Sequence, residues 1–420
     1  MFTERLAALK FPTVLGGLAV ISLLVNFAAQ SGAQRTVQFS SEATRVSFAL
    51  LHGRGFSDPF LTGPSGPTAQ MAPLYPFLHA AICALFGTGA AGWAMVLAIT
   101  AIAWATQWAY AFRFASALGQ PLLGLIVAVL GVLFPLPGRF FKWEAVFTGA
   151  ALAYCAWMMT GLLAGKHGKW LLARFGAGLA AAILFCPSTI LIWPAWSVLF
   201  LRRKGLMPAM RTLIPVFLIA LIPVSLWTVR NYLVLGHLFF IRDDVGMVLV
   251  SSYDDCASAL ISENVASGCF AREHPSGSPA MLQKLTAVGE FSFSDAEMRR
   301  TRTWVSSHPQ RSAVLTLEHI LYFWFPLDPV NRSTFLYGIL ISGLTVIGFR
   351  AFPWKSDLVA VLILTLLPFS FTYYTTQFEQ RYRYPVLWIS AVLACLGARL
   401  LISRLNSKAQ EIDGLVSSSS

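Results

Sequence analysis

The chain has 420 residues, of which 56% are hydrophobic and only 12% are charged, and its mean hydropathy is +0.64. Soluble globular proteins carry about 25% charged residues, so this chain has too little polar surface to enclose a water-facing core. The composition excludes a soluble enzyme and predicts an all-α polytopic membrane protein. The net charge of +12 requires no nucleic-acid partner, because membrane proteins concentrate Lys and Arg in their cytoplasmic segments.

Apolar runs close to the length of a membrane-spanning helix recur along the chain. The first run is followed by small residues, as a signal peptide is, but it is long for one, and we expect a retained anchor. A Pro directly after Cys186 predicts a break between the fifth and sixth runs. About ten runs are expected to cross the membrane: 11–29, 92–112, 121–137, 145–164, 171–185, 187–201, 212–229, 334–349, 358–374 and 384–403.

The distribution of charge predicts which side of the membrane each loop faces. If the amino terminus is cytoplasmic, the cytoplasmic segments hold nearly half of the 31 Lys and Arg residues but only about a fifth of the 19 Asp and Glu residues. This bias follows the positive-inside rule and places both termini in the cytoplasm. The assignment requires that two further apolar stretches, 73–86 and 315–326, do not cross, so we expect both to be helices in the interface of the outer leaflet.

These spans divide the chain into four parts. Residues 1–229 are expected to form an N-terminal transmembrane module that includes a first external loop, 30–91. Residues 230–333 are expected to form a second external region with turns, a few strands and an amphipathic helix. Residues 334–403 supply the C-terminal transmembrane helices, and 404–420, which end in four serines, are expected to be a disordered cytoplasmic tail. Long external segments usually carry a membrane protein's chemistry, so we expect the site there.

Two of the six cysteines, Cys256 and Cys269, lie in the second external region. An oxidising compartment favours a disulfide between them that ties this region together. The other four lie in apolar segments, as small core residues do. No ligand spacing repeats around the single nearby His274, so we expect no metal site and no cofactor.

The usual nucleotide-binding and hydrolase motifs are absent from the sequence, which leaves acids and bases at the external face as the candidates. Glu42 follows the first span and Glu144 begins the fourth, and a carboxylate at the rim of a span is solvated, paired or used in chemistry. The positive-inside rule does not explain basic residues at the external ends of spans. They pair with local acids or lipid headgroups, or they bind phosphate: Arg139, Lys142, Arg230, Arg381 and Arg383.

The order of these motifs resembles bacterial glycosyltransferases of the GT-C class, in the branch of protein O-mannosyltransferases and lipid A aminoarabinose transferases. The resemblance runs from about Glu42 to Pro385. It implies an integral protein of the bacterial inner membrane with a GT-C-like fold. It also implies inverting transfer of a sugar from a polyprenyl-phosphate donor to an envelope glycan, lipid or protein on the extracytoplasmic face. The residues that carry it are Glu42, HGRGFSDPF, GPTAQMAPLYPFLHAAICALFG, KWEAVF, WTVRNYLVLGHLFFIRDDVG, HPSG, GEFSFSD, HPQR and RYRYP.

The resemblance also implies roles for individual residues. Glu42 stands at the position of the general base for the acceptor and Glu144 at that of the second acid. Many relatives have two adjacent acids where this chain has Ser41-Glu42, so the resemblance does not extend to a two-acid metal site here. Arg381 and Arg383 are expected to face the carrier phosphate. We expect further phosphate contacts from Arg230 and Lys142, and substrate-lining roles for Tyr75, Trp143 and Glu290.

Other functions share some of these features. A transporter or flippase of lipid-linked sugars would also have many spans and a basic outer rim, but transporters usually place charge near the bilayer midplane. A glycan polymerase or ligase would use a pyrophosphate-linked donor and the same basic residues. A structural scaffold without activity is a further alternative if Glu42 and Glu144 lie far apart. The sugar, the acceptor and the oligomeric state do not follow from the sequence.

Overall fold

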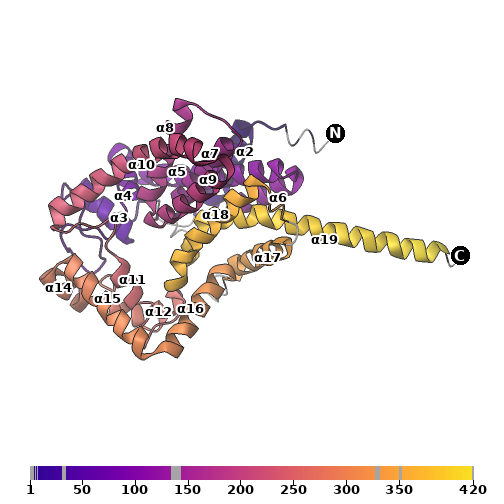
Figure 1. Ribbon diagram of the computed structural model, residues 1–420. Helices are drawn as coiled ribbons and strands as arrows, with labels where there is room; N and C mark the ends of the chain where they lie inside the picture. The colour runs from indigo at the N-terminus through magenta and orange to yellow at the C-terminus, as the bar shows by residue number, and fades with distance from the viewer. Residues whose placement is uncertain are drawn as a thin grey trace.

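The computed structural model describes residues 4, 6, 8–30, 35–133, 143–326, 332–349 and 352–418, apart from the side chains of 332–337 and 408–418. Over these residues the structure is helical, and its β-pairing is limited to two isolated bridges, Ser57 with Pro67 and Leu260 with Phe378. Figure 1 shows a bundle of helices with a smaller group of helices, α11 to α16, on one side. The predicted all-α architecture is confirmed for the described part of the chain.

The helices follow the apolar runs, and shorter helices fill the connections between them. The N-terminal half contains α2 (Phe11–Ala29), α3 (Glu42–Leu51), α4 (Leu74–Phe86), α5 (Ala90–Ala117), α6 (Pro121–Leu133), α7 (Ala145–Leu163), α8 (Lys169–Phe185), η2 (Pro187–Leu191), α9 (Ile192–Lys204) and α10 (Leu206–Leu235). The C-terminal half contains α11 (Val245–Val250), α12 (Ile261–Ala266), α13 (Cys269–Glu273), α14 (Pro279–Val288), α15 (Glu290–Ser307), α16 (Pro309–Trp324), α17 (Arg332–Gly348), α18 (Asp357–Phe371), η4 (Thr372–Thr375), η5 (Gln380–Tyr382) and α19 (Tyr384–Ser418).

Six described helical segments are long and apolar enough to cross a membrane. The other four predicted spans fall in α6, α8, α9 and α17, which have 13 to 17 residues. The structure therefore agrees with a multi-pass membrane protein, and the count of ten spans stays a prediction. The six segments are Phe11–Ala29, Ala90–Ala117, Ala145–Leu163, Leu206–Leu235, Asp357–Thr375 and Tyr384–Ser407.

Helix α5 packs against α2, α6, α7 and α19 and so lies at the centre of the bundle. A Cβ at Gly131 of α6 would overlap the ring of Trp108 on α5, so the glycine permits the close approach of the two helices. A Cβ at Gly397 of α19 would likewise overlap the Leu344 carbonyl of α17. Small residues have this role in membrane helices, where close van der Waals packing drives association.

The region between α10 and α17 differs from its prediction. The sequence predicts a few strands there, but α11 to α16 occupy it, and the described residues of this region form no strand. Gly268 and Gly289, both with positive φ, precede α13 and α15, and prolines begin α14 and α16. These residues divide the region into short helices, because each ends one helix or favours the first turn of the next.

The carboxy-terminal segment also differs from its prediction. The sequence predicts a disordered tail after residue 403, but α19 continues to Ser418 and extends beyond the rest of the bundle (Figure 1). The segment contains Lys, Ala, Gln, Glu and Leu, which are good helix formers, and an existing helix can be extended without a new nucleation step.

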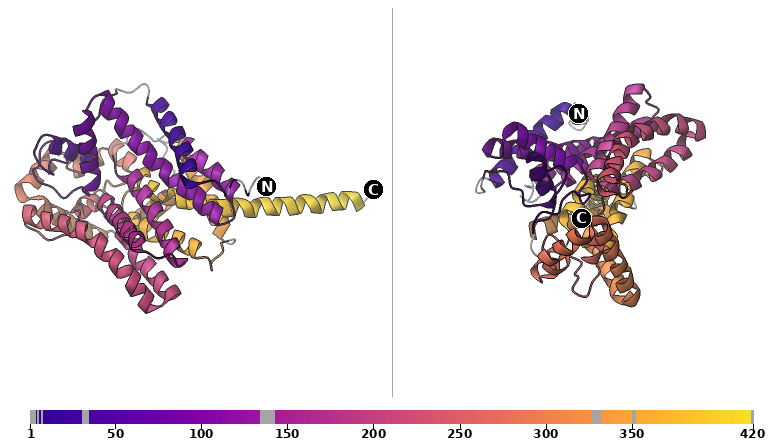
Figure 2. Two further views of the ribbon diagram at one scale, coloured as in Figure 1. Left: turned by 90° about the horizontal axis from the view of Figure 1, so that it is seen from above. Right: turned by 90° about the vertical axis from the view of Figure 1, so that its left-hand side faces the viewer.

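The two ends of the molecule are distinct. Figures 1 and 2 show the α11–α16 region at one end of the bundle and both termini at the opposite end. Helices α3 and α4, which come from the first predicted external loop, lie toward the same end as α11–α16 (Figure 1). The two predicted external segments therefore meet in the folded chain.

Candidate functional site

A cavity of about 550 Å³ lies where the bundle meets the α11–α16 region. Part of its wall is apolar and comes mainly from residues 240–261 and Phe270. The rest of the wall combines acids and bases that are far apart in the sequence. The ionisable residues that line it are Glu42, Glu144, Arg242, Asp244, His274, Glu379 and Arg381, with Cys186, Tyr373 and Tyr382.

Glu42 is the first residue of α3, and a capping box fixes the start of that helix. Ser41 Oγ accepts a hydrogen bond from the Thr44 N–H at 3.2 Å, and Thr44 Oγ1 accepts one from the Ser41 N–H at 3.0 Å. Glu42 Oε1 accepts a hydrogen bond from Ser276 Oγ at 2.5 Å, whereas Oε2 bonds to no described residue. One oxygen of this carboxylate is thus held in place and the other is left for a ligand.

His274 lies next to this carboxylate, with its Nε2 atom 3.7 Å from Glu42 Oε1. Its Nδ1 atom accepts a hydrogen bond from the Ser276 N–H at 3.1 Å. Burial lowers the pKa of His274, although the carboxylates of Glu42 and Asp244 oppose this effect. The ring is therefore neutral at neutral pH, and because Nδ1 is an acceptor, the proton lies on Nε2, which faces Glu42.

Glu144 directly precedes α7 and lines the same cavity. Its Oε2 atom is buried and has no hydrogen-bond partner within the described ranges. The same is true of three other polar atoms on residues of the cavity wall: Gln70 Oε1, Thr372 Oγ1 and Thr376 Oγ1. Buried polar atoms are normally hydrogen-bonded, so this group of unsatisfied atoms indicates a site that binds a polar ligand.

Arg381 brings a guanidinium group to the cavity from the loop before α19. Its Nε donates a hydrogen bond to Glu379 Oε2 at 2.5 Å, and its guanidinium carbon lies 3.5 Å from the centre of the Trp143 ring. Burial opposes the charge, but nearby carboxylates, first among them Glu379, more than offset burial and raise the pKa of Arg381. This group is therefore charged, and its Nη1 atom bonds to no described residue.

Arg242 supplies a second guanidinium group, which the sequence interpretation did not single out. Its Nε donates to the Gln70 carbonyl at 2.9 Å, and its Nη2 atom lies 2.5 Å from Asp244 Oδ2. Burial raises the pKa of Asp244, and the Arg242 charge partly offsets this rise. The signal in the sequence is the run RDDVG after a long apolar span, which forms the end of one motif of the family resemblance.

The charges that line the cavity do not cancel. Four carboxylates face two guanidinium groups, and His274 is neutral. Each arginine already contacts one acid, Glu379 or Asp244. Glu42 and Glu144 form no ion pair with Arg or Lys among the described residues, so these two are the acids available for chemistry.

The described residues contain one cluster with the spacing of metal ligands, formed by Asp254, Cys256 and Glu273. Cys256 forms a disulfide with Cys269, with Cα atoms 5.7 Å apart, so its sulfur is not a thiolate ligand. Both carboxylates of the cluster bind Arg300. This cluster is therefore an ion-pair network rather than a metal site.

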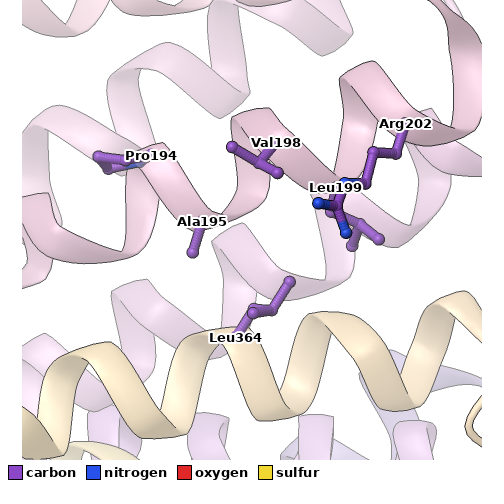
Figure 3. A pocket seen from close by; sticks show the side chains of 6 residues that line it. All are labelled: Pro194, Ala195, Val198, Leu199, Arg202 and Leu364. Carbon is purple, nitrogen blue, oxygen red and sulfur yellow. The ribbon is translucent and has the colours of Figure 1, made fainter.

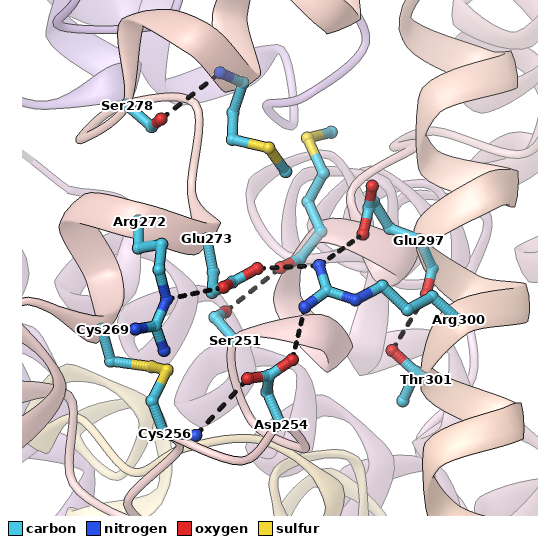
Figure 4. Close-up of polar contacts among 12 residues, drawn as sticks. Ser251, Asp254, Cys256, Cys269, Arg272, Glu273, Ser278, Glu297, Arg300 and Thr301 are labelled. Atoms are coloured by element: carbon cyan, nitrogen blue, oxygen red, sulfur yellow. Dashed lines mark hydrogen bonds and ion pairs between the residues drawn. A yellow bond between two sulfur atoms is a disulfide. The ribbon is translucent and has the colours of Figure 1, made fainter.

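That network supports the residues beside Glu42. The Arg300 guanidinium lies between Asp254 at 2.5 Å and Glu273 at 2.7 Å, next to the Cys256–Cys269 disulfide (Figure 4). Glu273 ends α13 and directly precedes His274. The disulfide and Arg300 thus hold both ends of α13, from which the chain passes to His274 and Ser276.

Arg383 has a different environment from Arg381. Its side chain is buried, and its guanidinium donates to the Trp324 carbonyl at 2.8 Å and to Ser342 Oγ at 2.6 Å, which joins α16 and α17 to the start of α19. It does not line the cavity. Residues two apart on a helical turn point to different sides, so the expectation that both arginines face one phosphate is revised.

The remaining predicted site residues differ in whether they line the cavity. Trp143 lines the cavity, whereas Tyr75 is buried beside Phe147. Arg230 donates to two backbone carbonyls of the first loop, so its contacts are structural. Lys142, like Arg139, lies outside the described residues.

Glu290 is buried between α15 and the first loop rather than in the cavity wall. It accepts hydrogen bonds from Thr68 Oγ1 at 2.5 Å and from the Ala69 N–H at 2.7 Å. Burial raises the pKa of Glu290 to about 8, and the hydrogen bonds only partly oppose this rise. The carboxyl is therefore mostly protonated at neutral pH and acts as a structural link between the two loop regions.

Comparison of the chain with protein-family models and with curated proteins finds no match.

Proposed function

We propose that this protein is an integral membrane glycosyltransferase that moves a sugar from a polyprenyl-phosphate donor to an acceptor of the cell envelope. The observation that carries the proposal is the shared cavity of Glu42, Glu144 and Arg381, which come from three distant parts of the chain. The cavity lies next to helices that are apolar enough to cross a membrane. A donor with a lipid tail and an anionic head needs both environments at one place.

Glu42 is the proposed general base. A base must lie within hydrogen-bond reach of the proton that it removes, and the free Oε2 atom of Glu42 can accept a bond from an acceptor hydroxyl in the cavity. Ser276 and His274 position the carboxylate through Oε1. The acceptor oxygen then attacks the anomeric carbon as its proton passes to Glu42.

Arg381 and Arg242 are the proposed contacts for the donor phosphate. The bond between the anomeric carbon and the phosphate oxygen breaks, and negative charge collects on the departing phosphate. Guanidinium groups stabilise that charge through paired hydrogen bonds, and the Nη1 atom of each arginine is available for this. Attack opposite the leaving phosphate inverts the anomeric centre, so no covalent enzyme intermediate is needed.

The wider assignments remain part of this proposal. They are ten spans, a GT-C-like fold, a position in the bacterial inner membrane with both termini in the cytoplasm, and a site on the extracytoplasmic face. Two observations support them: both termini emerge at the end opposite α11–α16 (Figure 1), and the two predicted external segments both line the cavity.

The proposal can be tested with purified protein in detergent and a panel of short-chain polyprenyl-phosphate sugars, with a cell-envelope extract as the acceptor mixture. We expect release of polyprenyl monophosphate and transfer of label to one envelope component. Turnover of pyrophosphate-linked oligosaccharides alone would indicate a polymerase or ligase. Movement of lipid-linked sugar across a vesicle bilayer without any bond cleavage would indicate a flippase and would refute the proposal.

A further inference from the structure

A second pocket, of about 380 Å³, lies between α9 and α18 and shares no residue with the cavity described above. Figure 3 shows that one face of α9 forms one wall and that Leu364 of α18 faces it. Arg202 is the only charged residue among those that line it. The lining residues are Pro194, Ala195, Val198, Leu199, Arg202 and Leu364.

The sequence explains why a groove forms here. Residues 194, 195, 198, 199 and 202 lie at helical spacing, so they share one face of α9. Pro194 and Ala195 have small side chains and leave space that Leu364 does not fill. The groove is thus apolar along its length and becomes basic where α9 ends.

The basic end of the groove is held in place by contacts between the two helices. Arg203 forms an ion pair with Asp357 at 2.8 Å and donates to the Lys355 carbonyl at 3.2 Å. Both members of this pair are partly exposed, so the pair contributes little stability, but it fixes where the end of α9 meets the start of α18. Asp357 is thereby occupied, and the Arg202 guanidinium has no hydrogen-bond or ion-pair partner within the described part of the chain.

This end of the groove has an excess of positive charge. Within residues 202–204 and 352–357, which the structure describes, four basic residues accompany the single acid Asp357: Arg202, Arg203, Lys204 and Lys355. Trp354 is exposed beside Lys355, and aromatic residues of this kind mark the level of lipid headgroups. An apolar groove that ends in unpaired positive charge at headgroup level matches the chemistry of one molecule, a phospholipid with a net negative headgroup.

We propose that the α9–α18 groove binds an anionic glycerophospholipid, with an acyl chain along Ala195, Val198 and Leu364 and the phosphate at Arg202. A guanidinium binds phosphate oxygens through charge-assisted hydrogen bonds, and in the groove this contact has no competing carboxylate. Phosphatidylglycerol is the probe that follows from this chemistry. The inference stands apart from the proposed function, because the two cavities have no residue in common.

Native mass spectrometry of the delipidated protein tests the inference, with phosphatidylglycerol and phosphatidylcholine added in turn. We expect wild type to bind phosphatidylglycerol in preference, and Arg202→Gln to lower that affinity roughly tenfold or more. Ala195→Trp fills the groove and is expected to remove binding of both lipids at this site. Arg404→Gln, at an exposed arginine of α19, and Leu218→Trp, at an exposed apolar position of α10, are the matched controls and are expected to bind as wild type does.

Each other outcome overturns the inference. If Arg202→Gln lowers phosphatidylglycerol binding but Ala195→Trp does not, the lipid headgroup binds to surface charge and the acyl chain does not occupy the groove. If Ala195→Trp lowers binding but Arg202→Gln does not, the groove takes an apolar chain without regard to the headgroup. Unchanged binding in both variants, or an equal loss in the two controls, would show that this groove is not the site. Displacement of the lipid by the same concentration of inorganic phosphate would exclude a role for the acyl chain.

Discussion

Substitution of Glu42 by Gln tests the chemistry most directly. The substitution keeps the shape of the side chain and one acceptor oxygen, so the hydrogen bond from Ser276 can persist. The amide cannot take a proton from the acceptor at neutral pH. We therefore expect Glu42→Gln to fold, to bind donor and to lose transfer.

The expected loss follows from the role of a general base, which contributes about 10²- to 10⁴-fold to a rate. This corresponds to roughly 3 to 5 kcal/mol of transition-state stabilisation. Ser276→Ala is the matched control, because it removes one hydrogen bond to Oε1 and leaves the carboxylate in place. A charge-assisted hydrogen bond contributes about 1.5 to 3 kcal/mol, so its removal is expected to reduce turnover less than the loss of the base.

The assay is single-turnover transfer of labelled sugar from a short-chain polyprenyl phosphate, with donor binding measured separately. Glu144→Gln is measured in parallel, since its Oε2 atom also lacks a partner among the described residues. Turnover of Glu42→Gln within tenfold of wild type would refute the base assignment. A loss of donor binding equal to the loss of turnover would instead assign Glu42 to the donor site.

Four further predictions concern the cavity and the residues that support it. Arg381→Ala is expected to weaken donor binding roughly 10- to 100-fold, and also to lower the free energy of unfolding, because Glu379 loses its ion-pair partner. Arg383→Ala is expected to lower the free energy of unfolding by about 2 to 4 kcal/mol, because it removes two charge-assisted hydrogen bonds of a buried side chain, as thermal unfolding and donor titration can show. The pKa of Glu290 is about 8 in the folded protein and near 4.5 when unfolded, so the contribution of this group to stability is greatest below about pH 4.5. It is expected to fall by up to about 1.4 kcal/mol per pH unit as pH rises to about 8, and Glu290→Gln removes this fall in pH-dependent melting curves. Replacement of Cys256 and Cys269 by Ser is expected to destabilise the loop region by about 2 to 4 kcal/mol and to reduce transfer more than donor binding, as hydrogen exchange and the transfer assay can measure.

Each of these predictions has an outcome that contradicts it. Equal donor affinity in wild type and Arg381→Ala would remove the phosphate role, and a selective loss of donor binding in Arg383→Ala would restore the original expectation for that residue. A Glu290→Gln variant with the same pH dependence as wild type would show that another group is responsible. Full transfer activity in the double serine variant would mean that the disulfide does not position the residues beside Glu42.

The sequence by itself determined the elements that depend on local composition. Hydropathy over stretches of about 20 residues located helices at all ten predicted spans, because a helix satisfies its own backbone hydrogen bonds and its apolar side chains can face lipid. Six of these lie in segments that meet the length and hydropathy needed to cross. The predicted external loops that contain Glu42, Trp143, Glu144 and Arg381 could be located for the same reason: they are where the apolar runs stop.

Tertiary structure alone decided which of these polar residues share a cavity. Arg381 and Arg383 have the same side chain and lie only two residues apart. Arg381 nevertheless lines the cavity, whereas Arg383 joins three helices. Arg242 and His274 joined the site through contacts between segments far apart in the sequence, since Arg242 donates to the Gln70 carbonyl and His274 lies beside Glu42. Local periodicity specifies which face of a helix is apolar, but the partner of its polar face depends on long-range packing, which no short stretch of sequence contains.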